Sequence, residues 1–84
     1  MKIEILGSGC PKCRGLTALV ERVVKESGVM ADIIKVEDIA EIVKRGALST
    51  PVLVIDGEIK LVGRSASAGE IKKWIGNESQ KEAR

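Results

Sequence analysis

The 84-residue sequence contains no histidine, tyrosine or phenylalanine, and its only aromatic residue is Trp74. The absence of histidine excludes catalysis by an imidazole and metal sites that combine cysteine with histidine. Because aromatic side chains are almost absent, the hydrophobic core must be aliphatic, and we expect Trp74 to pack against it. The chain is too short for two separate cores, so we expect a single small domain.

Charge of one sign and long apolar runs are also scarce. Lysine and arginine number 14 against 12 acidic residues, and the net charge of +2 is too small and too evenly spread to indicate a nucleic-acid partner. No apolar run approaches the ~18 residues of a membrane span, and the strand-like start at Met1 does not fit a secretory signal. We expect a cytoplasmic monomer with neither a membrane nor a nucleic-acid partner.

The sequence has only two cysteines, and they are close neighbours in Cys10-Pro11-Lys12-Cys13. A secreted disulfide framework would use more cysteines and would join distant segments. A close pair indicates redox or metal chemistry in a reducing compartment. On one turn of a helix the two thiols would lie on the same face, where they can close into a disulfide.

The apolar pattern predicts four strands and three helices within residues 1–76, followed by a polar, frayed tail over residues 77–84. The expected strands cover residues 3–6, 32–36, 51–55 and 58–62. The expected helices begin at Pro11, after Asp38 and after Ser67. Asp56-Gly57 is a hairpin signal between the last two strands.

These elements predict an α/β fold. A first strand pair joined by a helix should be parallel with a right-handed crossover, and the hairpin adds an antiparallel pair. A four-stranded mixed sheet with helices on both faces gives every amphipathic element a partner. The continuous apolar run over residues 51–55 predicts a strand that is buried on both faces.

Three features together resemble the thioredoxin superfamily: the strand–Cys-x-x-Cys–helix opening, Thr50-Pro51 before a buried strand, and the Asp-Gly hairpin. The resemblance covers about residues 1–76. It is closest to the small, glutaredoxin-sized redox-active disulfide proteins. It implies the order β-α-β-α-β-β-α, the sheet order 2-1-3-4, and a cis peptide bond at Thr50–Pro51, although X–Pro bonds in general favour trans.

The resemblance also implies a protein-disulfide reductase that carries electrons through a dithiol. Cys10 would be the nucleophile and Cys13 the resolving cysteine, with no cofactor beyond the disulfide that they form. Cys10 would lie at the N-terminus of a helix, which favours negative charge, and Lys12 and Arg14 are nearby. Both features would favour the Cys10 thiolate. The residues expected to bind the substrate protein are Gly9, Pro11, Lys12, Thr50, Pro51 and Gly63.

Two differences from the glutaredoxin pattern indicate which electron donor the protein uses. Glutaredoxins have a tyrosine between the cysteines where this sequence has Lys12, and they hold glutathione with an acidic pair after the last strand. Here Gly63 is followed by Arg64 and no acid, and we interpret Arg64 as a solvated loop charge. We therefore expect a thioredoxin-reductase-like flavoprotein rather than glutathione.

Glu4 lies six residues before Cys10, where thioredoxin carries a buried aspartate beneath the dithiol. One interpretation is a partly buried carboxyl with a raised pKa, which accepts the proton of Cys13. The other is a glutamate that extends to solvent near the end of its strand. The sequence alone leaves both interpretations open.

Two other functions use the same cysteine pair. Small copper-chaperone domains also carry Cys-x-x-Cys after a first strand and hold Cu(I) with two soft thiolates. Their order is strand-helix-strand-strand-helix-strand, however, and they need no Thr-Pro. The remaining possibility is a binding adaptor that keeps the fold without catalysis. We expect no resident metal.

Overall fold

The computed structural model describes residues 1–9, 11–47 and 49–82, and of residues 77–82 it describes the backbone only. The elements in chain order are β1 (Lys2–Leu6), α1 (Pro11–Ser27), β2 (Asp32–Val36), α2 (Ile39–Lys44), β3 (Val52–Ile55), β4 (Glu58–Val62) and α3 (Ala68–Glu82). This is the β-α-β-α-β-β-α order that the sequence predicts.

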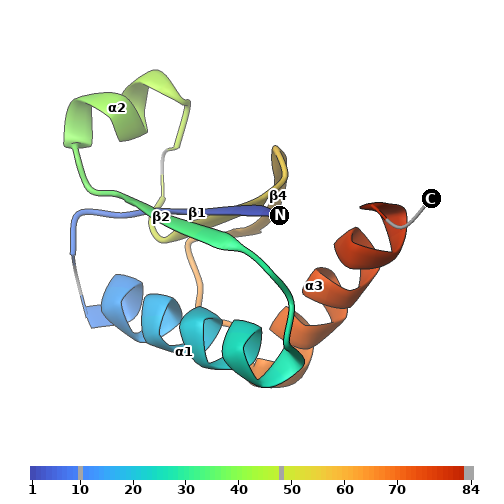
Figure 1. Cartoon of the computed structure of the whole chain (residues 1–84). Coiled ribbons are helices and arrows are strands. Elements are labelled where there is room, and N and C mark those ends of the chain that lie inside the picture. Colours follow the sequence, from blue (N-terminus) through green and yellow to red (C-terminus); the bar gives the residue numbers. More distant parts are fainter. Residues whose placement is uncertain (10, 48, 83–84) are drawn as a thin grey trace.

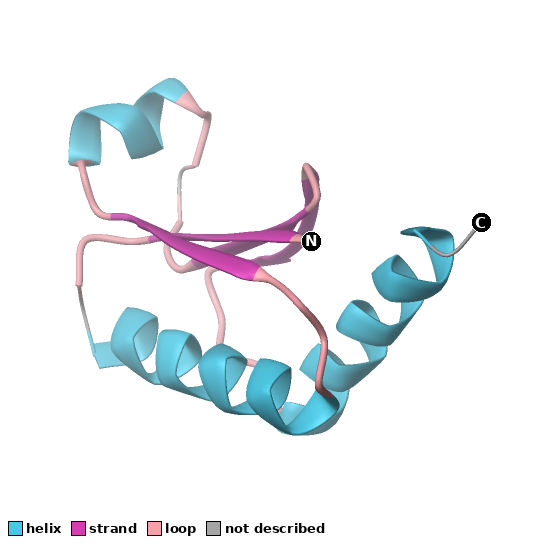
Figure 2. Ribbon diagram, viewed as in Figure 1, coloured by secondary structure: helices cyan, strands magenta, loops and turns pink. Residues whose placement is uncertain are grey.

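The four strands form one mixed sheet in the order β2-β1-β3-β4. β1 pairs parallel with β2 and antiparallel with β3, and β3 pairs antiparallel with β4. α1 and α3 lie on one face of this sheet and α2 on the other (Figure 1). Figure 2 shows the resulting layers, with the magenta strands between the cyan helices. The predicted fold class is confirmed.

Short-range signals in the sequence account for the ends of several elements. The Asp38 carboxylate caps α2 by accepting a hydrogen bond of 2.9 Å from a backbone N–H of the first turn. Before α3, the Ser67 hydroxyl and the Glu70 carboxylate each accept a 3.2 Å bond from the other residue's backbone N–H, which is a capping box. Asp56 and Gly57 both have positive φ, at 49° and 84°, as a tight hairpin turn requires.

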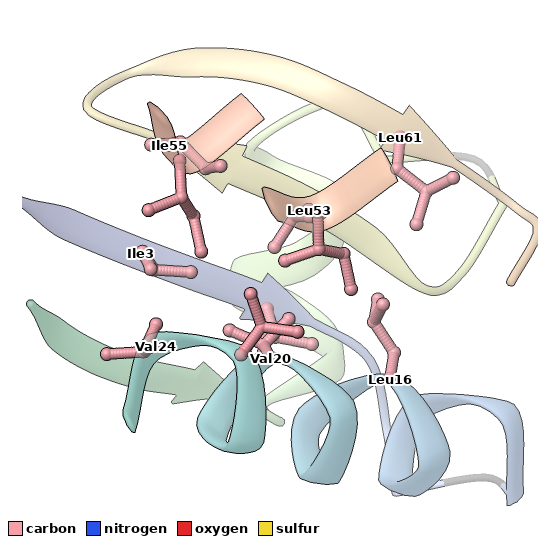
Figure 3. Close-up of a cluster of buried hydrophobic side chains, with 11 residues drawn as sticks. Ile3, Leu16, Val20, Val24, Leu53, Ile55 and Leu61 are labelled. Atoms are coloured by element: carbon pink, nitrogen blue, oxygen red, sulfur yellow. The ribbon is translucent and has the colours of Figure 1, made fainter. Parts of the chain in front are cut away.

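The larger hydrophobic core fills the space between the sheet and the two helices α1 and α3. Figure 3 shows side chains from β1, β3, β4 and α1 pointing toward one another in this layer. The labelled members are Ile3, Leu16, Val20, Val24, Leu53, Ile55 and Leu61. A smaller cluster on the other face joins Ile42 of α2 to Leu6, Val52 and Val54. β3 therefore contributes to both clusters, as its continuous apolar run predicts.

The α2 helix buries less than its sequence predicts. Ile39, Ile42 and Val43 have the spacing of one apolar face, but only Ile42 is buried. Ile39 is 66 % exposed and Val43 is 65 % exposed. A helix of six residues makes fewer than two turns, so it directs a single side chain into the cluster beneath it.

The last helix is longer than the sequence pattern suggests. A frayed tail was expected from Asn77, whereas the backbone of α3 stays helical to Glu82. Residues 77–82 contain glutamate, glutamine and lysine, which favour helices, and no proline. The assignment of residues 1–76 as the domain and 77–84 as a tail stays a prediction, and residues 83–84 lie outside the described residues.

We expect the larger core to depend strongly on Leu53. Its side chain is fully buried, so Leu53→Ala would leave a cavity and lower the free energy of unfolding by about 2–5 kcal/mol. The matched control is Ile59→Ala, because Ile59 lies on β4 and is 64 % exposed. Urea denaturation of both variants measures the difference, and equal losses would contradict the core assignment.

Candidate functional site

Strand ends meet at one edge of the sheet. β1 ends at Leu6, whose register partners are Val36, the last residue of β2, and Val52, the first residue of β3. The residue after β1 and the residue before β3, which are Gly7 and Pro51, are therefore placed at this same edge. Because β1 leads into α1, the start of that helix also lies here (Figure 1).

Cys13 lies in the first turn of α1 and is buried, with 4 % of its surface exposed. A Cβ atom placed on Gly7 would lie 2.3 Å from the Cys13 Sγ and 3.9 Å from the Pro51 Cα. The sulfur therefore packs directly against the backbone of Gly7, close to Pro51. One turn later, the Thr17 hydroxyl donates a 2.9 Å hydrogen bond to the carbonyl oxygen of Cys13.

The Thr50–Pro51 peptide bond is cis, as the family resemblance implied. Pro51 is buried, Thr50 is half-buried, and the Pro51 carbonyl accepts a 2.8 Å hydrogen bond from the backbone N–H of Gly63. Gly63 has a φ of 69°, and a Cβ there would lie 2.9 Å from the Cβ of Ser49. Both the backbone conformation and this close contact require glycine at position 63. Three of the expected substrate-binding residues thus lie together.

Cys10 lies outside the described residues, but its two neighbours are described. Gly9 has a φ of 85°, and Pro11 begins α1. Lys12 and Arg14 are exposed in the first turns, and the first turn of α1 carries no acidic residue. Lys12, Arg14 and the unpaired backbone N–H groups at the start of this helix each contribute positive charge or partial charge there.

A cleft of about 410 Å³ opens beside Cys13, between α1 and the ends of β1 and β2. Its lining carries charges of both signs, from Arg14, Glu21, Lys35 and Glu37. The Glu37 Oε2 lies 3.4 Å from the place that a Cβ on Gly9 would occupy. Sequence reasoning missed Lys35 and Glu37. The parallel pairing of the first two strands was the signal for them, since it brings the end of β2 to the edge where β1 ends.

Glu4 is buried, as the first interpretation expected, but its pKa is lowered rather than raised. It is 8 % exposed, so it does not extend to solvent, and its carboxylate receives two hydrogen bonds from the Arg45 guanidinium, at 2.5 and 3.1 Å. These hydrogen bonds hold the pKa of Glu4 below its usual value, against the opposing effect of burial. The expectation of a raised pKa is therefore wrong.

Glu4 also lies on the wrong face of the sheet for its expected role. Its neighbours Ile3 and Ile5 belong to the core cluster with α1, and side chains alternate along a strand. Glu4 consequently points to the face of α2, where Arg45 follows the helix, whereas Cys13 is on α1. The geometry gives no support to Glu4 as the proton acceptor of Cys13.

Two other residues considered in the sequence lie away from Cys13. Trp74 is half-buried and packs against the larger core, as expected. Arg64 is not simply solvated, because its guanidinium lies 3.1 Å from the carboxylate of Glu70 and lowers the pKa of that group. The pair is exposed, so it adds little to the free energy of unfolding.

Among residues 1–9, 11–47 and 49–82, no three His, Cys, Asp or Glu side chains are grouped so that they could hold a metal ion. In the same residues, no helix is long and apolar enough to cross a membrane. The observed order of elements also differs from that of the copper-chaperone domains. This order of elements gives no support to the copper-handling alternative.

Comparisons with known proteins agree with this geometry. A family model described as a thioredoxin domain matches residues 1–76. A thioredoxin of Methanothermobacter thermautotrophicus is 42 % identical over 75 residues, which is 89 % of this chain and 97 % of the relative. A thioredoxin of Methanocaldococcus jannaschii is 39 % identical over 73 residues, covering 87 % of this chain and 84 % of the relative.

Among solved structures, thioredoxin 1 of Thermosipho africanus is similar with a TM-score of 0.68, over the full length of both chains and at 19 % identity. This similarity concerns the fold. The family model and the two sequence relatives go further, and the chain belongs to the thioredoxin family. Membership supports thiol–disulfide oxidoreductase activity in general.

We expect the ion pair between Glu4 and Arg45 to make stability depend on pH. Because the pKa of Glu4 is lower in the folded chain than its usual value of 4.5, the pair stabilises the fold above that value. This stabilisation is lost as the pH falls through the lower, folded-state pKa. Arg45→Met should lower the free energy of unfolding at neutral pH by about 1–2 kcal/mol, between the values for exposed and buried pairs.

Denaturant titrations from neutral pH to below pH 4 check this expectation, and the deficit of Arg45→Met should shrink on acidification. Arg22→Met is the matched control, since Arg22 lies 3.8 Å from Glu26 in a pair with both side chains more than half exposed. A deficit that is constant with pH, or equal in the two variants, would argue against a specific role of the Glu4 carboxylate.

Proposed function

We propose that this protein reduces disulfide bonds in other proteins through Cys10 and Cys13. The observation that carries the proposal is the position of Cys13, buried against Gly7 and beside Pro51 at the start of α1, in a chain of the thioredoxin family. The role of Cys10 follows from its place in the Cys-x-x-Cys sequence, three residues before Cys13.

The reaction consists of two thiol–disulfide exchanges. The Cys10 thiolate attacks one sulfur of the substrate disulfide, which forms a mixed disulfide and releases one substrate thiolate. The Cys13 thiolate then attacks the Cys10 sulfur, which releases the second substrate thiolate and leaves a Cys10–Cys13 disulfide. Two electrons pass from the dithiol to the substrate. The positive potential of Lys12, Arg14 and the helix end favours the attacking thiolate.

Substrate binding is assigned to the residues around this pair, namely Gly9, Pro11, Lys12, Thr50, Pro51 and Gly63. The Pro51 Cα lies 3.9 Å from the place of a Cβ on Gly7, the same place that lies 2.3 Å from the Cys13 Sγ. A substrate peptide that pairs through its main chain with the Thr50 segment would gain affinity with little demand on its side chains. Such binding suits a reductase that acts on many different proteins.

The electron donor in this proposal is a thioredoxin-reductase-like flavoprotein, and the compartment is the reducing cytoplasm. Lys12 stands where glutaredoxins have a tyrosine, and no acid follows Gly63 to hold glutathione. The chain has a single pair of cysteines, three positions apart, and such a pair fits a reducing compartment. The protein would act as a monomer.

Substitution of each cysteine tests the proposed roles. With dithiothreitol as reductant, Cys10→Ser should lose the catalysed reduction of insulin disulfides and leave only the rate of dithiothreitol alone, because the attacking thiol is gone. Reduced Cys13→Ser, freed of dithiothreitol before insulin is added, should instead accumulate a mixed disulfide with insulin, visible on a non-reducing gel, because no resolving thiol is present. If Cys13→Ser turns over insulin as fast as the parent, the two roles are wrongly assigned. If the parent protein itself is inactive, the protein is not a reductase, and the alternative function of a binding adaptor is favoured.

Coupled assays test the electron donor. With insulin as substrate, NADPH and a thioredoxin reductase from an organism with a similar thioredoxin should sustain turnover, followed as loss of NADPH absorbance. Glutathione with glutathione reductase should give only the background rate, since the residues that would hold glutathione are missing. Efficient turnover with glutathione as the sole reductant would refute this part of the proposal.

A further inference from the structure

Gly7 is the glycine in closest contact with a reactive group among the described residues. A Cβ placed on it would lie 2.3 Å from the Cys13 Sγ and 3.1 Å from the Cys13 Cβ. Ordinary contacts of a Cβ begin at about 3.4 Å. Gly7 is not among the glycines with positive φ, so its backbone conformation would accept alanine. What requires glycine at this position is the sulfur of Cys13.

The backbone of Gly7 cannot retreat to make room for a side chain. Its N–H donates a 2.9 Å hydrogen bond to the carbonyl of Val36 at the end of β2. The preceding residue, Leu6, is paired with strands on both sides. The Pro51 Cα, 3.9 Å from the hypothetical Cβ, limits the space further. A methyl group at position 7 would therefore displace the Cys13 sulfur.

We propose that Gly7 is a positioning residue for the resolving thiol, because its missing side chain leaves the space that the Cys13 sulfur occupies. The inference rests on the proposed function and concerns its second step. In that step the Cys13 thiolate attacks the Cys10 sulfur, the bond from Cys10 to the leaving group breaks, and the leaving group departs as a thiolate. This attack depends on the position of one sulfur atom.

The size of the effect follows from the distances. To reach 3.4 Å from a methyl carbon that would otherwise lie at 2.3 Å, the sulfur must move by about 1 Å. A misplacement of about 1 Å can slow a reaction by ~100-fold when the geometry of attack is otherwise fixed. The first step uses Cys10 and not Cys13, so it should not share the loss.

Single-turnover reaction of the reduced protein with dithiobis(nitrobenzoate) separates the two steps. This aromatic disulfide releases one coloured aryl thiolate when Cys10 attacks it, and a second when Cys13 resolves the mixed disulfide. In Gly7→Ala the first release should keep the parent rate, and the second should slow about 10- to 100-fold. Gly15→Ala is the matched control, since a Cβ on Gly15 meets no atom within 4 Å, and both of its releases should match the parent.

Two results would overturn the inference. One is a second thiolate release in Gly7→Ala that keeps the parent rate. The other is an equal slowing of both releases, which would indicate a general disturbance of the fold. A parent protein that releases fewer than two equivalents contradicts the proposed function itself. The failure of the inference and the failure of the function are therefore distinguishable.

A stability measurement tests the same contact without any reaction. In the reduced proteins, Gly7→Ala should lower the Tm of the parent and should lower that of Cys13→Ala by much less, because the sulfur is then absent. If Gly7→Ala alone does not fold, the double variant Gly7→Ala/Cys13→Ala should regain the fold. An undiminished loss in the Cys13→Ala background would overturn the proposal.

Discussion

The pairing of β1 on both of its sides is the constraint on which the site depends. Hydrogen bonds to β2 and β3 fix the strand in the middle of the sheet. They also hold Gly7, the residue after the strand, against the first turn of α1 and close to Pro51. The Cys13 sulfur packs directly against this backbone. The proposed resolving thiol is thus held at the end of a strand that is paired on both sides.

Much of this fold could be predicted, because its signals are local. The cap at Asp38, the capping box of Ser67 and Glu70, and the Asp56-Gly57 turn each require only neighbouring residues, and each has the expected geometry. The sheet order and the cis bond before Pro51 came from the resemblance to a family, since no local pattern specifies either.

Contacts between distant segments could not be predicted. The charge of Glu4 was clear from the sequence, but its partner Arg45 is 41 positions away and reaches it only after α2 has crossed the sheet. The contact of Gly7 with Cys13 follows from the packing of a helix on a strand end, which no local pattern specifies. The same reason explains Ile39 and Val43, whose spacing suggested burial although α2 is too short to provide it.

The short α2 helix has a consequence for how the molecule opens. It is attached to the sheet by one buried side chain, Ile42, and by the ion pair that Arg45 makes just beyond its end. α1, on the opposite face, contributes four buried aliphatic residues to the larger core. Local unfolding should therefore begin at α2, and its amide hydrogens should exchange with solvent faster than those of α1. Partial opening of this kind would leave the layer that carries Cys13 intact.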